Sequence, residues 1–415
     1  MVKRQSVKDI LPHLFREEYA KMTAVLCRLF GIQHIEIAED LASDTFLKAS
    51  EYWAIHGIPE NPVAWLYTVA KNKAKDYYKH TSIVEEKLQE IFRTARNEVL
   101  QETETIEQYI ADSQLAMIFA VCDPAISTEA QICLALQILC GFSITEISDA
   151  LLSKPETIKK KLLRARDNLR NTNFQIVLLS ETEIKLRLSA VLKTLYLLFS
   201  EGYFSKSSQH YIRKELCLEA IRLTLILTES PLTNTATANA LLALMCFQSS
   251  RLEARTDQHG KIILFDEQDT SLWDQALIDR GNYYLVKACT GDEVSKYHLE
   301  AAIAYWHTTV GNEKKWPQIL ELYNQLICIE DSPVTALNRV YAFSRIYGKE
   351  KALEELLKGK KTESSYYYEL LGFLYADTEI SKAIHYYSEA IKLVKSGAEK
   401  QHIEQEIERL KTLLD

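Results

Sequence analysis

The sequence has few of the residues that interrupt helices. Twelve glycines and eight prolines among 415 residues amount to about 3% and 2%, below the usual ~7% and ~5%. Nothing in it reads as a run of alternating strands. So few turn residues in a long chain favour long helices joined by short loops, and we predict an all-α fold. The length allows two to four domains.

Long apolar runs are also missing. No stretch approaches the ~18 residues that a membrane span needs. The start, MVKRQSVKDI, is followed by the charged segment LPHLFREEYAK, which is unlike a signal peptide. We therefore expect a cytoplasmic protein with no membrane partner.

The eight cysteines lie apart and form no C-x-x-C pair, which argues against a disulfide framework or a zinc site. Most lie in apolar helical runs, among them Cys27, Cys133, Cys217, Cys246 and Cys328. We expect them to be small buried hydrophobic residues in a reducing compartment.

Patterns typical of catalysis are absent as well. The ten histidines form no H-E-x-x-H or similar pattern, and no glycine-rich phosphate loop occurs. We therefore predict a protein that is not an enzyme, with no catalytic residue, no metal and no cofactor.

The charge is unevenly spread along the chain. A formal net charge of −8 argues against wholesale coating of nucleic acid. Residues 154–170, however, carry seven basic side chains against Glu156 and Asp167, and residues 71–79 carry four lysines against Asp76. Any contact with DNA is therefore expected to be local.

Residues 143–170 are typical of a helix-turn-helix. Two S-x-x-E capping boxes, which begin at Ser143 and Ser153, each predict a helix start. Pro155 suits the first turn of the second helix.

The second of these helices is apolar on one side and basic on the other. The apolar stripe recurs at helical spacing and consists of Ile158, Leu162, Ala165 and Leu169. The opposite side has Thr157, Lys160 and Arg164, with Lys159, Arg166 and Arg170 along one edge. In a recognition helix the first side chains reach base edges and later cations neutralise phosphate. A solvated basic helix is the alternative, but the paired caps and the short turn favour a DNA reader.

Residues 61–79 predict a helix of another kind. It starts at Asn61-Pro62, and its apolar side carries Trp65, Leu66, Val69 and Tyr77. The other side carries Lys71, Lys75 and Lys79, with Thr68 and Tyr78 beside them. Cations interleaved with aromatic rings suit unpaired DNA. The preceding loop at residues 54–60 could hold an extruded base.

An acidic patch precedes this helix. Asp40 and Asp44 lie four residues apart on one helix face and could meet a basic partner. The alternative is a routine ion pair between Asp44 and Lys48.

These blocks divide the chain. We predict a first helical domain at residues 8–80, a polar linker with some helix at 81–112, a second domain at 113–171 and a helical extension at 172–415. Near the C-terminus, small and aromatic residues recur at tetratricopeptide (TPR) spacing, namely Leu371, Gly372, Tyr375, Ala383, Tyr387 and Ala390. Small residues there let paired helices approach closely. Generic helical hairpins are the alternative to a TPR-like array.

At these residues the chain resembles sigma factors of the extracytoplasmic-function type, within the sigma-70 family. AEDLASDTFLKASEYW looks like the family's core-polymerase-binding helix, NPVAWLYTVAKNKAKDYYK like its −10-reading helix, and residues 144–170 like its −35-reading helix-turn-helix. Residues 112–143 and downstream segments such as FDEQDTSLWD resemble a subgroup with a large TPR-like C-terminal extension. The turn that most members build with glycine has Leu152 here.

The resemblance implies roles for individual residues. Asp40 and Asp44 would meet core RNA polymerase. The −10 region of promoter DNA would be held or read by Trp65, Lys71, Asn72, Lys75, Asp76 and Lys79. The −35 element would be faced by Thr157, Lys159, Lys160, Lys161, Arg164 and Arg166.

The segment FDEQDTSLWD of the extension allows two interpretations, a calcium site or a helix cap. Asp266, Glu267 and Asp269 lie close together, but the glycine and terminal glutamate of a calcium loop are missing. A helix cap at Thr270 or Ser271 with Trp273 packed beneath is therefore favoured. Trp273 and Asp274 are the candidates for a contact with a protein partner of the extension.

The resemblance thus implies a sigma factor that directs promoter-specific initiation, with a TPR-like extension that acts in cis. One alternative is a helix-turn-helix regulator with a TPR-like sensor that does not bind core polymerase. Another is a helical scaffold with no role at DNA.

Overall fold

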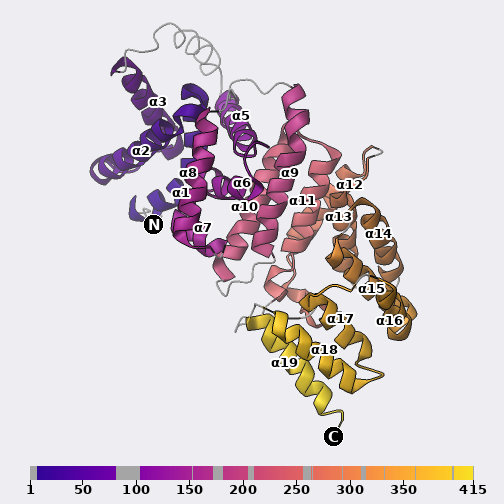
Figure 1. Ribbon diagram of the computed structural model, residues 1–415. Helices are drawn as coiled ribbons and strands as arrows, with labels where there is room; N and C mark the ends of the chain where they lie inside the picture. The colour runs from indigo at the N-terminus through magenta and orange to yellow at the C-terminus, as the bar shows by residue number, and fades with distance from the viewer. Residues whose placement is uncertain are drawn as a thin grey trace. The chain divides into compact units, whose positions relative to one another are not determined.

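The computed structural model describes residues 7–80, 103–151, 153–171, 181–203, 210–255, 263, 265–291, 293–309, 315–330, 332–359, 361–394 and 397–414. Every regular element in these ranges is a helix (Figure 1), which confirms the predicted all-α class. The chain divides into two compact units, Met1–Leu198 with Glu229–Thr233, and Phe199–Thr228 with Asn234–Asp415.

The first part of unit 1 is a small helical module. Its elements are α1 (Val7–Phe30), η1 (Ile32–His34), α2 (Ile35–His56) and α3 (Pro62–His80). Gly31 and Gly57 separate them at φ of 86° and 82°, a backbone conformation that glycine adopts without steric cost. Both α2 and α3 pack against α1, so the two predicted functional helices share one core.

The rest of unit 1 continues with further helices. These are α5 (Thr103–Val121), α6 (Thr128–Leu134), the π-helical segment η2 (Ala135–Leu139), α7 (Ile144–Ala150), α8 (Pro155–Asn171) and the first part of α9 (Glu181–Tyr203). Helix α5 begins inside the stretch interpreted as a linker and packs against α1. Residues 81–102 of that stretch lie outside the described residues.

A buried polar network joins α9 to α6 within unit 1. Thr194 Oγ1 donates to Gln131 Oε1 at 2.6 Å, and Gln131 Nε2 donates to the carbonyls of Asp123 and Ile126. Arg187 Nη1 reaches Asp123 Oδ2 at 2.8 Å. Gln131 is thereby satisfied on both sides of its amide, as a buried polar side chain requires. The first turns of the extension are therefore built into the same core as α6.

Unit 2 is a longer series of helices. After α10 (His210–Glu229), α11 (Ala236–Ser249) and the 3-10 turns η3 (Leu252–Arg255), η4 (Phe265–Glu267) and η5 (Thr270–Leu272), it has α12 (Gln275–Ala288), α13 (Lys296–Thr308), α14 (Lys315–Ile329), α15 (Pro333–Tyr347), α16 (Lys349–Lys358), α17 (Ser365–Tyr375), α18 (Ile380–Leu393) and α19 (Gly397–Lys411). From α12 onward each helix packs against the next one in the chain. Such neighbour-to-neighbour packing is typical of helical arrays.

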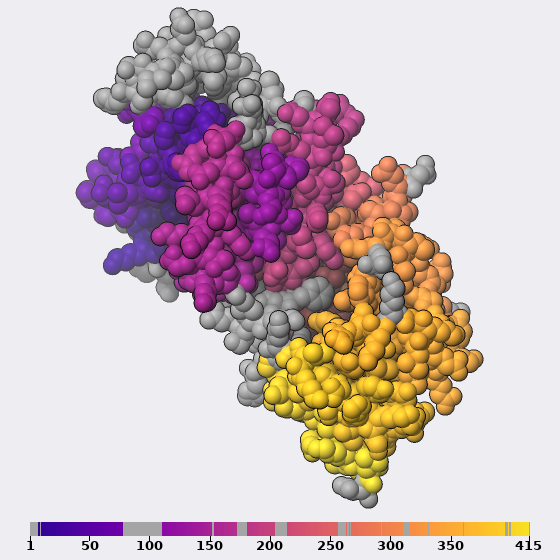
Figure 2. Space-filling view, viewed as in Figure 1, coloured from indigo at the N-terminus to yellow at the C-terminus, as the bar shows by residue number. Residues whose placement is uncertain are grey.

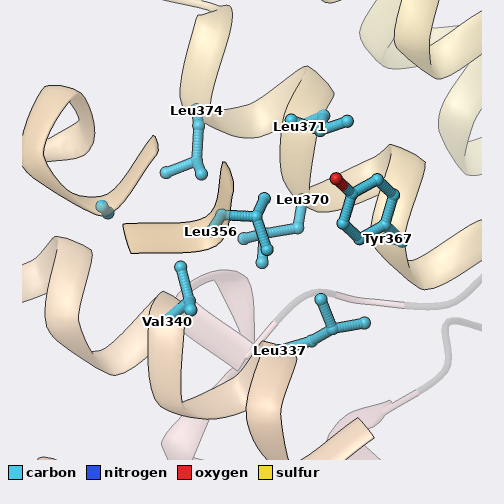
Figure 3. Packing of buried hydrophobic residues seen from close by; sticks show 8 residues of the cluster. Leu337, Val340, Leu356, Tyr367, Leu370, Leu371 and Leu374 are labelled. Carbon is cyan, nitrogen blue, oxygen red and sulfur yellow. The ribbon is translucent and has the colours of Figure 1, made fainter. Parts of the chain in front are cut away.

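The packing of α15, α16 and α17 illustrates how the array builds its core. Leu337 and Val340 of α15, Leu356 of α16, and Leu370 and Leu374 of α17 point into one apolar cluster (Figure 3). No single helix buries this cluster alone, so each pair depends on its neighbour.

Close approach of α17 and α18 depends on a glycine. A Cβ added to Gly372 would lie 2.8 Å from the ring of Tyr387. Ala383 and Ala390 on α18 are fully buried. The expected small residues do therefore lie where the two helices meet, whereas a TPR-like arrangement as such stays a prediction.

The cysteines follow the sequence expectation with two exceptions, Cys289 and Cys328, which are both exposed. Cys27, Cys133, Cys217 and Cys246 are buried, and burial raises the pKa of the Cys246 thiol to about 12. The prediction for Cys328 was wrong: it is exposed on α14 and donates to the Asn324 carbonyl one turn earlier. Apolar neighbours in sequence do not decide which side of a helix a residue faces.

Among the described helices, none is both long and apolar enough to cross a membrane.

We predict that Gly372→Ala destabilises unit 2 by ~1–3 kcal/mol, because the added methyl forces Tyr387 out of its place. The measurement is urea denaturation of the full chain followed by circular dichroism. Gly397→Ala is the matched control, since a Cβ there meets nothing within 4 Å. Equal denaturation midpoints for the two variants would contradict the packing argument.

Candidate nucleic-acid interface

The predicted helix-turn-helix corresponds to α7 and α8. The first capping box is confirmed: Glu146 N–H donates to Ser143 Oγ at 3.2 Å, and Ser143 N–H donates to Glu146 Oε2 at 2.7 Å. The second prediction was wrong by one residue. Helix α8 begins at Pro155, and the carbonyl that accepts its first bonds belongs to Lys154 rather than Ser153. Leu152 lies outside the described residues.

Burial of its apolar stripe fixes the rotation of α8. Ile158, Leu162, Ala165 and Leu169 are 1–3% exposed, and α8 packs on α6 and α7. This confirms the predicted stripe. Leu163, which lies off the stripe, is 59% exposed.

Four of the predicted −35-reading side chains face solvent. These are Thr157, Lys159, Lys160 and Arg164. The space-filling view shows the segment with α7 and α8 (magenta) open on the viewed face (Figure 2). We refer to these four residues as the open face of α8. A polar side chain in the first turn followed by cations matches what a duplex reader needs.

The remaining two predicted residues of α8 are engaged inside unit 1. Lys161 Nζ donates to Glu129 Oε2 at 2.5 Å, and this bond lowers the pKa of Glu129. Arg166 is held more firmly: its guanidinium forks onto the Glu39 carboxylate of α2 at 2.6 and 2.8 Å and also reaches Gln137 Oε1 at 2.9 and 3.1 Å. Burial alone would lower the pKa of Arg166, but the bonds to Glu39 outweigh it and raise that pKa.

A second, more exposed pair accompanies the first. Arg170 Nη1 lies 3.3 Å from Glu36 Oε1, and Arg170 Nη2 lies 2.7 Å from Asp167 Oδ1. Sequence reasoning missed Glu36, Glu39 and Gln137. The sequence did contain a signal for these pairs. Two acidic residues of α2 are three positions apart, and two arginines of α8 are four positions apart, so each pair lies on one helix face. Nothing in the sequence shows, however, that these two helices are in contact.

The first module presents an aromatic group at the end of α2. The ring of Trp65 stacks on Tyr52 at 5.5 Å and lies 5.4 Å from Trp53, while Tyr52 stacks on His56 at 4.1 Å. Trp53 is buried, and Tyr52 is 40% exposed. The structure thus surrounds the predicted Trp65 with Tyr52 and His56, which sequence reasoning missed. Exposed rings of this kind are platforms for unstacked bases.

The loop beside this aromatic group is shorter than the predicted 54–60, because α2 continues to His56. The loop is held by hydrogen bonds at both ends. Gly57 N–H donates to the Trp53 carbonyl at 3.0 Å, and Asn61 Oδ1 accepts the N–H of Ala64 at 2.9 Å. The predicted helix start at Asn61 is therefore confirmed, with Pro62 at the first helical position.

The cations of α3 differ in their surroundings. Lys71 is half-buried; burial lowers its pKa, and the charge of Lys75 lowers it further. Asn72, Lys75 and Asp76 are exposed. The Lys79 side chain lies outside the described residues.

The acidic patch on α2 faces solvent. Asp40 and Asp44 are both exposed. Asp44 Oδ2 accepts from Lys73 Nζ of α3 at 3.2 Å, so the partner is Lys73 rather than the Lys48 that helical spacing suggested. An exposed pair of this kind contributes ~0–1 kcal/mol and leaves the patch open to a basic partner.

The extension candidates lie at a helix start in unit 2. Asp274 caps α12 by accepting the Leu277 N–H at 3.0 Å, and Asp269 caps η5 by accepting the Ser271 N–H at 2.9 Å. The predicted caps at Thr270 or Ser271 were therefore wrong, because the aspartates before them fill that role. Trp273 packs on Phe265 with ring centroids 6.2 Å apart, as the packing prediction required. The Asp266 side chain lies outside the described residues. The described part of the chain holds no group of three or more residues placed to bind a metal.

Comparison with known proteins identifies part of the chain. Residues 14–82 match sigma-70 region 2, and residues 187–289 match a family of unknown function (DUF6596). An uncharacterized protein of Rhizobium meliloti (strain 1021) is 28% identical over 401 residues, which is 94% of each chain. No solved structure matches the chain. The region 2 match covers α2 and α3 and supports a sigma-70 family factor. Such a match implies binding to core RNA polymerase and to promoter DNA.

We predict that Trp65→Leu weakens binding of a single-stranded oligonucleotide by about five- to a hundredfold, because one stacked base contributes ~1–3 kcal/mol. Fluorescence anisotropy with the full chain measures this. Leu47→Ala is the control, since Leu47 is an exposed apolar residue of α2 that lies outside the aromatic group and the loop. Equal losses in both variants would show that general apolar contact, rather than ring stacking, binds the strand.

We also predict that Lys160→Ala and Arg164→Ala each reduce the salt dependence of duplex binding. Each lost phosphate contact changes the slope of log affinity against log salt by about 0.9. Titrations of a short duplex at several salt concentrations give the slope. Lys400→Ala, on α19, should leave it unchanged, and an unchanged slope in all three variants would remove the open face of α8 from the interface.

Proposed function

We propose that this protein is a sigma factor of the extracytoplasmic-function type, which recruits core RNA polymerase to promoters. One observation carries the proposal: the segment that matches sigma-70 region 2 and a capped helix pair with an open cationic face occur in this order within one compact unit. Such a protein acts in the cytoplasm, where its polymerase and DNA are.

The −35 element would be read by the open face of α8. Thr157 and Lys160 lie in the first turns of the helix, where side chains reach base edges in the major groove. Arg164, one turn later, suits a phosphate. The buried stripe supports this reading because it holds these residues on the solvent side.

The melted −10 strand would bind the first module. Its aromatic group offers ring faces to unpaired bases, and Lys71 and Lys75 on α3 supply charge for the backbone. The half-buried Lys71 has its charge less screened by water than an exposed lysine would have. Asp40 and Asp44 would meet a basic surface of the core enzyme.

The extension would regulate initiation in cis as a TPR-like array. Two observations support this. The helices from α12 onward pack in chain order, and α9 joins the α6 core through the Thr194–Gln131 bond. A change in α9 therefore has a direct physical route to the elements under α8.

The test adds the purified full-length chain to core polymerase and scores promoter-specific transcripts on genomic fragments. We expect initiation, and its absence on every fragment would overturn the proposal. Lys160→Glu combined with Arg164→Glu should abolish initiation but keep core binding, whereas Lys400→Glu should do neither. Asp40→Lys should weaken core binding; full DNA-dependent regulation without any core binding would instead indicate a regulator with a sensor domain.

A further inference from the structure

The ring of Phe265 is the centre of a group of polar side chains in unit 2. The ring centroids of His307 and Trp273 lie 4.8 and 6.2 Å from its own, and Arg251 Cζ lies over the ring at 5.0 Å from the centroid. Gln268 follows one 3-10 turn later, where its N–H donates to the Phe265 carbonyl at 3.3 Å. Phe265 and two of its neighbours thus come from the segment FDEQDTSLWD, and the other two come from the end of α11 and from α13.

These side chains contain buried polar atoms that have no partner. Among the described residues, eight buried side-chain nitrogen or oxygen atoms make no hydrogen bond, and four of the eight belong to this group. They are Nε of Arg251, Oε1 of Gln268, Nε1 of Trp273 and Nδ1 of His307. Buried polar atoms are normally paired, because an unpaired one loses its hydration without compensation. Four such atoms around one ring indicate a ligand that supplies the partners. We refer to these four residues as the Phe265 site.

Contacts of the backbone bring the segments of the Phe265 site together. Asp274 N–H donates to the Ser250 carbonyl at 2.8 Å, and Trp273 and Arg251 are their direct neighbours in the chain. Trp273 therefore lies beside Arg251. The guanidinium of Arg251 is also held in place, since its Nη2 donates to Tyr203 Oη at 3.2 Å. The unpaired Nε thus has a fixed direction.

The Phe265 site is electropositive. Burial is the main cause that lowers the pKa of His307 to about 3, and the charges of Arg251 and Lys315 lower it further. His307 is therefore neutral near pH 7, where its Nδ1 can either donate or accept. Lys315 Nζ lies 5.1 Å from the centroid of the Phe265 ring. An anion at this position would be attracted by two cations in surroundings where water screens charge weakly.

The unpaired atoms determine which anion fits. Arg251 and Trp273 offer two N–H donors, and neutral His307 adds a third from Nδ1. A planar carboxylate accepts such a set, and its two oxygens match the N–H groups of a guanidinium. The larger number of acceptor oxygens on a tetrahedral phosphate would exceed the donors of the site.

Gln268 adds a second requirement. Its Oε1 only accepts, so the ligand must also carry a donor close to the carboxylate. An ammonium group would be repelled by Arg251 and Lys315, whereas a hydroxyl group is uncharged. The four atoms together therefore fit an acid with a neighbouring hydroxyl.

We propose that unit 2 binds a small hydroxycarboxylic acid at the Phe265 site. The carboxylate accepts from Arg251, Trp273 and His307, and the hydroxyl donates to Gln268 Oε1. Because these atoms are shielded from water, a small molecule fits the site better than the terminus of a partner protein. The proposal goes beyond the proposed function and concerns unit 2 alone, so it does not depend on a role in transcription.

The test follows the indole N–H resonance of Trp273 in the full chain by two-dimensional ¹H–¹⁵N NMR, with Trp273→Phe to assign it. The probes are lactate, its uncharged amide lactamide, propionate, which lacks the hydroxyl, and inorganic phosphate. We expect lactate to move the resonance to lower field, because the N–H gains a charged acceptor, and lactamide to leave it unchanged. Propionate should bind about two- to tenfold more weakly than lactate, since the bond to Gln268 is missing.

Three results would overturn the proposal. The first is an unchanged Trp273 resonance in the presence of lactate. The second is tighter binding of phosphate than of lactate, which would contradict the carboxylate assignment. The third is a shift that only a peptide with a free C-terminal carboxylate produces, which would make the site a contact for another protein.

Two conservative substitutions test the assigned roles. Arg251→Lys keeps the positive charge but removes the Nε donor, and we expect it to weaken lactate binding about tenfold or more because a charge-assisted bond is lost. Gln268→Met removes the acceptor with little change in size. It should bind lactate and propionate equally, and a preserved preference for lactate would contradict the role of Gln268.

Trp306→Phe is the matched control. It also removes an indole N–H from unit 2, but Trp306 packs on Tyr305 with ring centroids 5.5 Å apart and is not part of the Phe265 site. Isothermal titration calorimetry should show unchanged lactate binding in this variant and about tenfold weaker binding in Trp273→Phe. Lactate should also raise the unfolding midpoint of the unsubstituted chain. Equal losses of affinity in the two variants would overturn the site, whatever the result of the transcription assay.

Discussion

Burial of one apolar stripe on α8 is the constraint on which the functional surface depends. Ile158, Leu162, Ala165 and Leu169 are almost completely removed from water against α6 and α7, and each large aliphatic side chain buried in this way contributes ~1.5–3 kcal/mol. Because a helix is rigid, fixing this stripe also fixes where every other side chain of α8 points. The same burial that stabilises the unit therefore divides its cations into an open set and an engaged set.

This division gives the cations of one helix different roles. Lys160 and Arg164 are exposed to solvent and can contact phosphate, whereas the guanidinium of Arg166 is hydrogen-bonded to Glu39 and Gln137. A count of positive charges in the sequence cannot distinguish the two sets. Burial also divides the aromatic rings of the first module. Trp53 is buried in the core, whereas Tyr52, which stacks on Trp65, is partly exposed to solvent.

Much of the fold could be predicted because local rules agree with one another along the chain. The all-α class, the Ser143 cap, the helix start at Asn61 and the stripe on α8 all came from spacing and capping chemistry. Errors arose where the geometry allows a neighbouring residue to take the same role. Lys154 rather than Ser153 precedes α8, and Asp269 and Asp274 rather than Thr270 or Ser271 cap their helices. Cys328 faces solvent because an apolar context in sequence does not specify a side of the helix.

The sequence by itself determined which helices form, which side of each is apolar, and that the residues matching sigma-70 region 2 precede a basic helix pair. These properties depend on contacts between residues a few positions apart. Only the tertiary structure decided that Asp44 pairs with Lys73, that Tyr52 joins Trp65, and that Arg166 meets Glu39 across 127 positions. Such pairs require that separate helices pack side by side, and their orientation follows from burial of the whole core rather than from any local pattern.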